Sequence, residues 1–200
     1  WKKNKVNLID IPGDSNFVAD TPASLRVVDG VVIVVSAVDG LQLYTEKVWT
    51  AATELDIPKI IFINKVDHDQ ADIKSVLESI KKKFKVDPFC INTAVGTGEK
   101  FTGVIDVILK KFHSYQKDGS GENKTDAIPD LMAEEVNYSF AELTELVAEV
   151  DDGLTENYLE NGELSKKEFD DGFKRGLKEG KLLPVFFGSA TQNMGVDLLM

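Results

Sequence analysis

Short apolar runs alternate with amphipathic segments through the first half of the chain. The runs at residues 6–9, 31–35 and 59–63 are rich in Val and Ile, which is typical of parallel strands buried on both faces. Segments with helical periodicity lie between and after these runs, at residues 17–28, 42–55 and 72–84. Strand and helix alternating at this spacing predict βαβ units in a doubly wound, mostly parallel α/β sheet.

The middle of the chain breaks this alternation. Strand patterns occur at residues 86–91 and 102–108, and apolar residues at steps of three and four after Pro129 predict a long helix. Ser165 and Glu168 form a capping-box pattern at the start of a further helix.

A buried-strand pattern returns at residues 182–187, where the α/β pattern resumes. We therefore predict two parts. Residues 1–68 and 182–200 form a partial α/β domain, and residues 69–181 form an inserted, acidic α+β subdomain.

The acidic side chains are concentrated in this insert. Residues 116–171 hold 17 of the 34 acidic and 4 of the 23 basic side chains, so the rest of the chain is close to neutral. A solvated acidic helix surface is the simpler interpretation, and a docking face for a partner is the alternative. Within this stretch, the polar, glycine-containing segment 117–124 predicts a hairpin end.

Composition excludes several classes of protein. The net charge of −11 argues against a broad nucleic-acid-binding face, and no apolar run approaches the ~20 residues of a membrane span. The one cysteine, Cys90, cannot form an internal disulfide, which suits a reducing compartment. No leader-like segment follows Trp1. We expect a cytoplasmic protein that binds neither DNA nor membranes.

Asn64-Lys65-Val66-Asp67 directly follows a predicted buried strand, at the sheet edge where ligands of such folds bind. A carboxylate at Asp67 can accept both N–H donors of the guanine edge, and adenine would leave that charge unpaired. Asn64 could hold the base edge and neighbouring loops, while the Lys65 stem packs on the ring. The alternative is an ordinary strand-end turn capped by Asn and Asp.

Two further groups follow predicted strands. Asp10-Ile11-Pro12-Gly13 could place a carboxylate on Mg²⁺ through water and a backbone N–H on a terminal phosphate, or could be a simple Pro-Gly turn. Gly188-Ser189-Ala190 could offer backbone N–H groups to the guanine carbonyl, and a plain strand-to-helix turn is equally compatible.

Several other features predict no site. The phosphate-cradling pattern Gly-x-x-x-x-Gly-Lys-Ser/Thr is absent from the sequence, and we interpret residues 96–100 as a hairpin loop. His68 and His113 have no partners at metal-ligand or triad spacing. Cys90 lies in an apolar strand pattern and is interpreted as a small core residue.

Taken in order, these motifs resemble the translational GTPase family. Residues 6–13 and 24–30 look like its second switch and following helix, and residues 45–49 and 62–67 continue the match. The insert is similar to the extra subdomain of bacterial elongation factor G. The similarity is clearest at residues 101–106, 158–160 and 188–190. The likeness covers essentially the whole chain.

The resemblance implies a P-loop GTPase-type fold, GTP or GDP with Mg²⁺ as ligands, and the ribosome as partner. It also implies that the acidic insert meets ribosomal stalk proteins. By motif match, the Mg²⁺ and γ-phosphate side would be formed by Asp10, Pro12 and Gly13, with Asp10 acting on the metal through water. The guanine side would be formed by Asn64, Lys65, Asp67, Ser189 and Ala190.

Asp14 stands where the family has a histidine that orients the attacking water. An ionised Asp14 adds negative charge where phosphoryl transfer needs it neutralised, so we expect slowed or altered GTP hydrolysis. Asn16 likewise stands where the family usually has aspartate.

The family's phosphate loop and first switch precede the segment that begins here, and its first strand would lie between the strands at 6–9 and 31–35. We therefore expect a fragment of the GTPase domain that by itself binds nucleotide weakly and is inactive.

The leading hypothesis is part of the GTPase domain of an elongation-factor-G-like protein, acting in translocation or a related step of translation. A second is a GTP-dependent ribosome-binding switch with little hydrolysis. A third is another translational GTPase, of the release-factor or ribosome-protection type. A fourth is a helical interaction domain on a nucleotide-free α/β scaffold.

Overall fold

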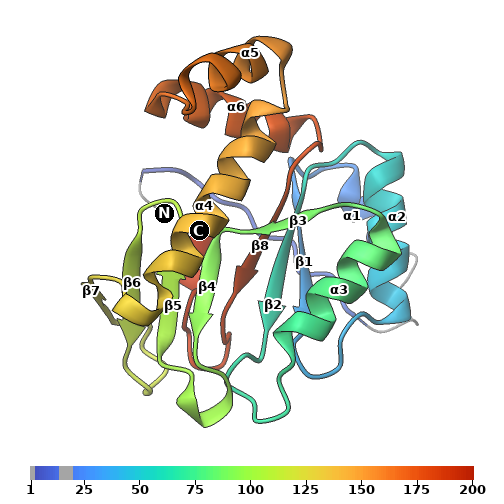
Figure 1. The fold of residues 1–200 in the computed structure, drawn as a ribbon. Coiled ribbons are helices and arrows are strands. Elements are labelled where there is room, and N and C mark those ends of the chain that lie inside the picture. The colour runs from blue at the N-terminus through green and yellow to red at the C-terminus, as the bar shows by residue number, and fades with distance from the viewer. Residues whose placement is uncertain (1–2, 14–19) are drawn as a thin grey trace.

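The computed structural model describes residues 3–13 and 20–200, which form two four-stranded sheets with helices around them (Figure 1). The first sheet is parallel, with the order β1-β2-β8-β3. Its strands are β1 (Val31–Ser36), β2 (Lys59–Asn64), β8 (Leu183–Phe187) and β3 (Pro88–Cys90). The predicted doubly wound, mostly parallel α/β fold is therefore confirmed.

The second sheet is an antiparallel meander in the order β4-β5-β6-β7. Its strands are β4 (Asn92–Val95), β5 (Gly103–Asp106), β6 (Lys111–Tyr115) and β7 (Asn123–Asp126). A 3₁₀ turn, η2 (Gly98–Lys100), lies in the β4–β5 loop, and segment 117–124 forms the end of the β6–β7 hairpin. Both loops agree with the sequence predictions.

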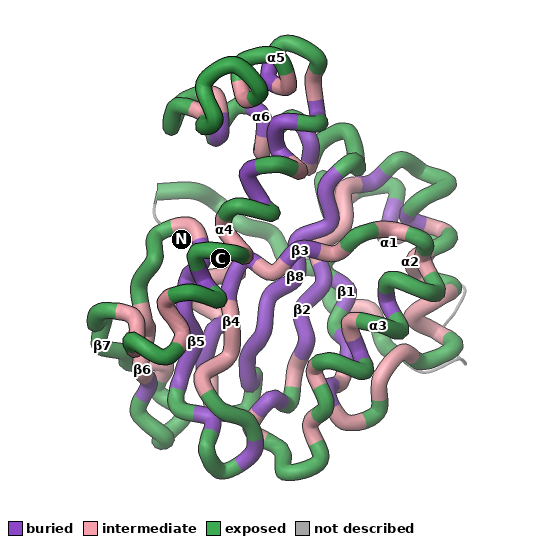
Figure 2. The backbone as a smooth tube through the Cα atoms, viewed as in Figure 1, coloured by how far each residue is buried: buried purple, intermediate pink, exposed green. Residues whose placement is uncertain are grey.

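Helices cover both faces of the parallel sheet. One face carries α2 (Leu43–Glu54) and α3 (Ile73–Phe84), and the other carries α4 (Asp130–Ala148) and α6 (Lys166–Lys178). The remaining helices are α1 (Asp20–Leu25), α5 (Asp152–Asn161) and α7 (Val196–Leu199). β2 and β8 are largely buried because they lie between two helical layers, as their purple colour shows (Figure 2). The predicted burial of β1 on both faces is wrong, because Val32 and Val34 are 43% and 58% exposed.

The core is continuous between the two sheets. Ile61, Ile63 and Val185 of the first sheet belong to the same buried cluster as Val104 and Tyr115 of the second. Aromatic residues fill the opposite face, where Phe62 and Phe186 pack with residues of α4 and α6. The two sheets are therefore held together by apolar contact.

Local caps fix the helix boundaries. The Asp72 side chain accepts a hydrogen bond from the Ser75 N–H at the start of α3. At the start of α6, Ser165 and Glu168 form the predicted capping box.

The prediction of a buried strand at residues 6–9 is wrong. Residues 4–13 have no helix or strand, and Val6, Leu8 and Ile9 are 47%, 83% and 50% exposed. In this structure no strand of the described chain pairs with these residues, and strand propensity alone is not enough to make them a strand.

The boundaries of the predicted insert do not coincide with the boundary between the sheets. β3 lies within residues 69–181 but pairs with β8 of the first sheet. Acidic side chains of the helical part are mostly exposed, among them Glu134, Glu142 and Glu149. In the described part of the chain, no helix is both long and apolar enough to cross a membrane.

Candidate functional site

The loop after β2 begins where the strand reaches the carboxyl edge of the parallel sheet. The Ala37 N–H donates to the Asn64 carbonyl across 2.8 Å, which ties the ends of β1 and β2 together. Lys65 has a φ of 65°, and the His68 N–H donates to its carbonyl, so the chain turns sharply. The Val66 side chain is fully buried and anchors the loop from below.

The loop after β8 lies directly against this turn. The Gly188 N–H donates to the Ile63 carbonyl at 3.0 Å, and the Val66 N–H donates to the Gly188 carbonyl at 3.3 Å. The Ala190 N–H donates to Oδ1 of Asn64 at 2.8 Å, which joins two motifs 126 residues apart in the sequence. A side chain at Gly188 would clash with the Met194 carbonyl and with the Phe62 ring, so this approach requires glycine.

Ser189 has a structural role inside its loop. The residue is fully buried, and its Oγ accepts from the Gln192 N–H at 3.2 Å. Its N–H donates to the Met194 carbonyl, and the Met194 N–H donates back to the Ser189 carbonyl. Ala190, by contrast, is exposed at the tip of the loop.

Asp67 presents an available carboxylate beside these loops. The residue is half-buried, and its carboxylate has no hydrogen-bond or ion-pair partner among residues 3–13 and 20–200. The structure thus brings five predicted residues into one pair of loops, namely Asn64, Lys65, Asp67, Ser189 and Ala190. In this structure, however, the N–H groups of residues 188–190, the predicted donors to the guanine carbonyl, donate instead to Ile63, Met194 and Asn64.

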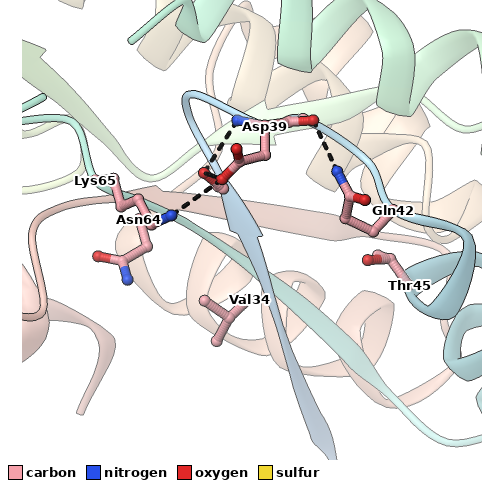
Figure 3. A pocket seen from close by; sticks show the side chains of 8 residues that line it. Val34, Asp39, Gln42, Thr45, Asn64 and Lys65 are labelled. Carbon is pink, nitrogen blue, oxygen red and sulfur yellow. Dashed lines mark hydrogen bonds and ion pairs between the residues drawn. The ribbon is translucent and has the colours of Figure 1, made fainter. Parts of the chain in front are cut away.

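A hollow of about 320 Å³ opens beside Asn64 and Lys65, at the ends of β1 and β2 (Figure 3). In its wall, Nζ of Lys65 lies 3.0 Å from Oδ2 of Asp39, and Oγ of Ser36 donates to the same oxygen at 2.7 Å. The hydrogen bond from Ser36, followed by the bond and charge of Lys65, lowers the pKa of Asp39. Lys65 and Asp39 therefore form an ion pair in the wall of the hollow.

The phosphate-side residues are placed differently. Asp10, Pro12 and Gly13 are exposed in an irregular segment, the dark-blue trace of Figure 1. Within the described residues, no hydrogen bond or ion pair joins Asp10, Pro12 or Gly13 to the loops after β2 and β8. Asp14 and Asn16 lie outside the described residues.

The other candidate side chains take structural positions. Nδ1 of His68 accepts from the Gln70 N–H, and Nδ1 of His113 lies 3.3 Å from Oδ1 of Asn123. Burial raises the pKa of the Cys90 thiol to about 12, so the thiol is not a ready nucleophile. No cluster of three or more His, Cys, Asp or Glu residues suited to a metal occurs in the described chain.

Sequence reasoning missed a buried amide that supports the site. Nδ2 of Asn92 donates to the Phe187 carbonyl at 3.1 Å, and Oδ1 of Asn92 accepts from the Phe187 N–H at 2.7 Å. Asn92 is fully buried and fixes the last residue of β8, directly before Gly188. Its only signal in the sequence is a polar residue at the end of an apolar strand pattern.

Two comparisons with known proteins agree with this geometry. The sequence matches the family described as the elongation factor Tu GTP binding domain over residues 1–200. A crystal structure of a Thermus thermophilus protein is similar to this chain with a TM-score of 0.84 at 30% sequence identity, over 93% of this chain. The chain spans only 27% of that protein's length. Since the family match extends over the entire sequence and the fold agrees with it, the chain belongs to the translational GTPase family, as a GTP-binding domain of the elongation factor Tu type.

Proposed function

We propose that the loops at residues 64–67 and 188–190 bind the guanine base of GTP or GDP. The observation that carries this proposal is the hydrogen bond from the Ala190 N–H to Asn64 Oδ1, which unites the two motifs at the ligand-binding edge of the sheet. The half-buried carboxylate of Asp67 fits the two N–H donors of guanine, and the Lys65 stem fits a ring face.

Competitive nucleotide binding tests this assignment. We expect calorimetric titration to show a preference for GDP over ADP, and Asp67→Asn to reduce that preference at least about tenfold. The amide introduced by this substitution would donate to the 2-oxo group of xanthine, so XDP should bind the variant better than the wild type. Asp171→Asn, which removes an exposed charge on α6, is the matched control. A wild-type protein without preference for GDP would overturn the proposal.

We further propose that Asp10, Pro12 and Gly13 face the phosphates and Mg²⁺. No heavy atom lies within 4 Å of a Cβ built at Gly13, so its backbone is open to a ligand. One exposed carboxylate fits Mg²⁺ held mainly by phosphate and water, with Asp10 acting through water. When bound, the ion would neutralise phosphate charge. Asp10→Ala should remove the Mg²⁺ dependence of GTP binding and leave GDP binding without Mg²⁺ unchanged.

We propose that hydrolysis is slow because Asp14 occupies the sequence position at which the family has the histidine that orients the attacking water. Its negative charge would oppose the charge that develops during phosphoryl transfer. Single-turnover GTP hydrolysis by the full-length protein with ribosomes should therefore accelerate in Asp14→His. Unchanged rates in the variant, together with wild-type turnover as fast as that of an ordinary elongation factor, would refute this. A wild type that binds GTP but does not hydrolyse it would identify the alternative, a GTP-dependent binding switch.

We propose an elongation-factor-G-like role on the ribosome in the cytoplasm, with residues 69–181 as an acidic insert that docks ribosomal stalk proteins. The observation in favour is that acidic side chains of α4, among them Glu142 and Glu145, are exposed, and that α5 lies away from both sheets with a largely exposed surface (Figure 2). Charge reversal at Glu142 and Glu145 should weaken ribosome binding in a salt-dependent way. Reversal of Lys74 and Lys82 on α3 is the control. If charge reversal at Glu142 and Glu145 left ribosome binding unchanged, docking through the acidic insert would be refuted. The remaining alternatives would be a release-factor or ribosome-protection role, or a nucleotide-free interaction domain.

A further inference from the structure

Each loop of the proposed guanine site is contacted from outside by a different loop of the second sheet. The β4–β5 loop reaches the turn after β2, where the Gly98 N–H donates to the Val66 carbonyl at 2.9 Å. Gly98 has a φ of +60°, and a Cβ there would lie 2.8 Å from Oδ1 of Asp69. This close approach therefore depends on glycine at position 98.

The β6–β7 hairpin reaches the segment that follows β8. The Tyr115 hydroxyl donates to Oδ1 of Asp197 at 2.5 Å, and Nδ2 of Asn123 donates to Oδ2 of Asp197 at 3.1 Å. Burial and the neighbouring Asp197 raise the pKa of Tyr115, so its hydroxyl remains a donor. Nδ2 of Asn193 donates to the Ser120 carbonyl at 3.2 Å. The loop carrying Ala190 is thus bonded to this hairpin on its outer side.

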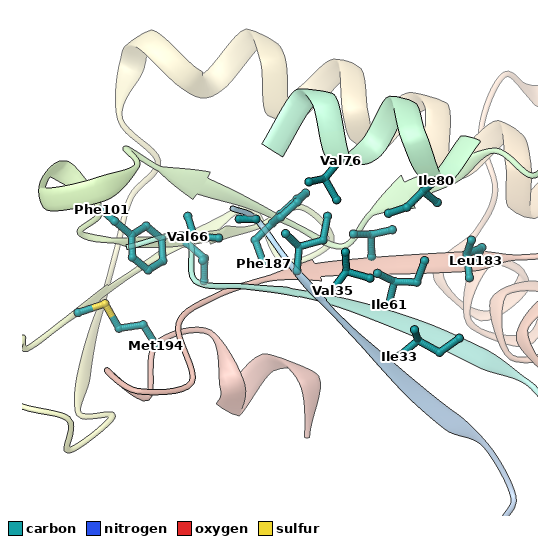
Figure 4. Close-up of a cluster of buried hydrophobic side chains, with 14 of the residues drawn as sticks. Ile33, Val35, Ile61, Val66, Val76, Ile80, Phe101, Leu183, Phe187 and Met194 are labelled. Carbon is teal, nitrogen blue, oxygen red and sulfur yellow. The ribbon is translucent and has the colours of Figure 1, made fainter. Parts of the chain in front are cut away.

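Buried side chains connect these contacts to one another. Phe101 lies with Gly98 in the β4–β5 loop, and Val66 and Met194 lie in the two base-binding loops. All three are at most 1% exposed, belong to one cluster and lie near one another (Figure 4). Nζ of Lys117 also donates to the Glu99 carbonyl at 2.6 Å, which links the two loops of the second sheet. Because packed interiors transmit small shifts, a displacement of the second sheet would reach both base-binding loops.

We propose that the second sheet is a platform that sets the guanine affinity of the chain, with Gly98, Tyr115 and Asp197 as positioning residues. This inference rests on the proposed guanine site and adds the residues that hold it in shape. None of the three is expected to touch the nucleotide. They act through Val66 and through the chain from Gly188 to Gly195.

The test uses Tyr115→Phe, which removes one hydroxyl and keeps the buried ring. The first readout is hydrogen exchange of the Ser189 and Met194 amides, which should rise about threefold to tenfold as their loop opens more often. The second is GDP affinity, which should fall by a similar factor while ADP binding changes less. Gln116→Ala is the matched control, since Gln116 bonds to Glu122 within the same hairpin and not to a base-binding loop.

A second variant, Gly98→Ala, tests the other loop. It should raise exchange at the Val66 and His68 amides more than at Ser189, whereas Tyr115→Phe should do the reverse. The proposal is supported if the two variants raise hydrogen exchange in different loops and both lose preference for GDP. A merely structural role would lower the melting temperature without these local patterns.

Two results would overturn the inference. The first is unchanged exchange in both loops, whatever the nucleotide affinity. The second is increased exchange with GDP preference intact. A wild type without preference for GDP would instead refute the proposed guanine site and, with it, the guanine role of the platform, while the exchange data would still report whether the loops depend on the second sheet.

Discussion

The segments 59–67 and 6–13 both combine a Val- or Ile-rich run with polar residues, yet the fold holds them very differently. Ile61 and Ile63 in the first segment are fully buried between β1 and β8, and backbone hydrogen bonds fix the loop that follows. In the second segment, Leu8 is 83% exposed and the backbone is irregular. Similar local sequence has produced a central strand in one case and no strand in the other.

The difference lies in the available neighbours. A parallel strand gains most of its stability from ladders on both sides and from cover on both faces. β2 has both, whereas β1 pairs only with β2 among the described strands, and Val34 on its outer side is 58% exposed. An apolar run forms a strand only where it can pair with the edge of another strand and pack against a second layer.

The largest expected effect comes from truncating the same residue type in the two segments. Ile63→Ala should lower the free energy of unfolding by about 2–5 kcal/mol, because it leaves a cavity in a fully buried site. Ile9→Ala should change it by less than about 0.5 kcal/mol. Urea unfolding curves of the two variants measure both values. Equal destabilisation would mean that residues 6–9 are packed in solution and would contradict the comparison.

Much of the fold follows from local sequence pattern. The strands at 31–35, 59–63 and 182–187, the capping box at Ser165 and the loops at 96–100 and 117–124 are where periodicity and turn chemistry place them. The failure at residues 6–9 arises because pattern reports the tendency to form a strand and not the presence of a partner.

The candidate site was predictable to the same degree. Asn64 ends one buried strand and Ala190 follows another, so strand topology alone brings them to one edge of the sheet. The clamp of Asn92 on Phe187 and the bond of Tyr115 to Asp197 span 95 and 82 residues. No local pattern marks pairs at such separations, because they depend on how the second sheet docks.

The clamp itself provides the next prediction. Asn92→Leu would leave the buried N–H and carbonyl of Phe187 without their partners, and should cost about 2–4 kcal/mol of unfolding free energy. The control is Asn137→Leu, since Asn137 is exposed and only accepts from Lys110. If thermal unfolding of the two variants were alike, Asn92 would not be the support of the base-binding end.

Two glycines offer a direct comparison of the base and phosphate sides. Gly188→Ala places a methyl group against the Met194 carbonyl and the Phe62 ring, and should cost about 1–3 kcal/mol. Gly13→Ala meets no atom within 4 Å and should be close to neutral in stability. Calorimetric melting of both variants checks this, and a destabilising Gly13→Ala would show that the phosphate-side segment is ordered against the fold.

The smallest expected effect concerns acid. The Ser36 hydrogen bond and the Lys65 contact lower the pKa of Asp39, so its carboxylate favours the folded state above its ordinary pKa near 4, and that contribution disappears as the pH falls through the lowered value. The contribution is small because the pair is exposed to solvent. In a carboxyl NMR titration, Ser36→Ala and Lys65→Met should each move the Asp39 midpoint upward, since the Ser36 hydrogen bond is the largest single cause and Lys65 adds both a hydrogen bond and a charge. Gln42→Ala should leave it in place, because Gln42 bonds only the Asp39 backbone carbonyl. An Asp39 midpoint that is unchanged in Ser36→Ala would mean that the Ser36–Asp39 hydrogen bond is not kept in solution. The base side would then be less rigid at its β1 edge than at β8.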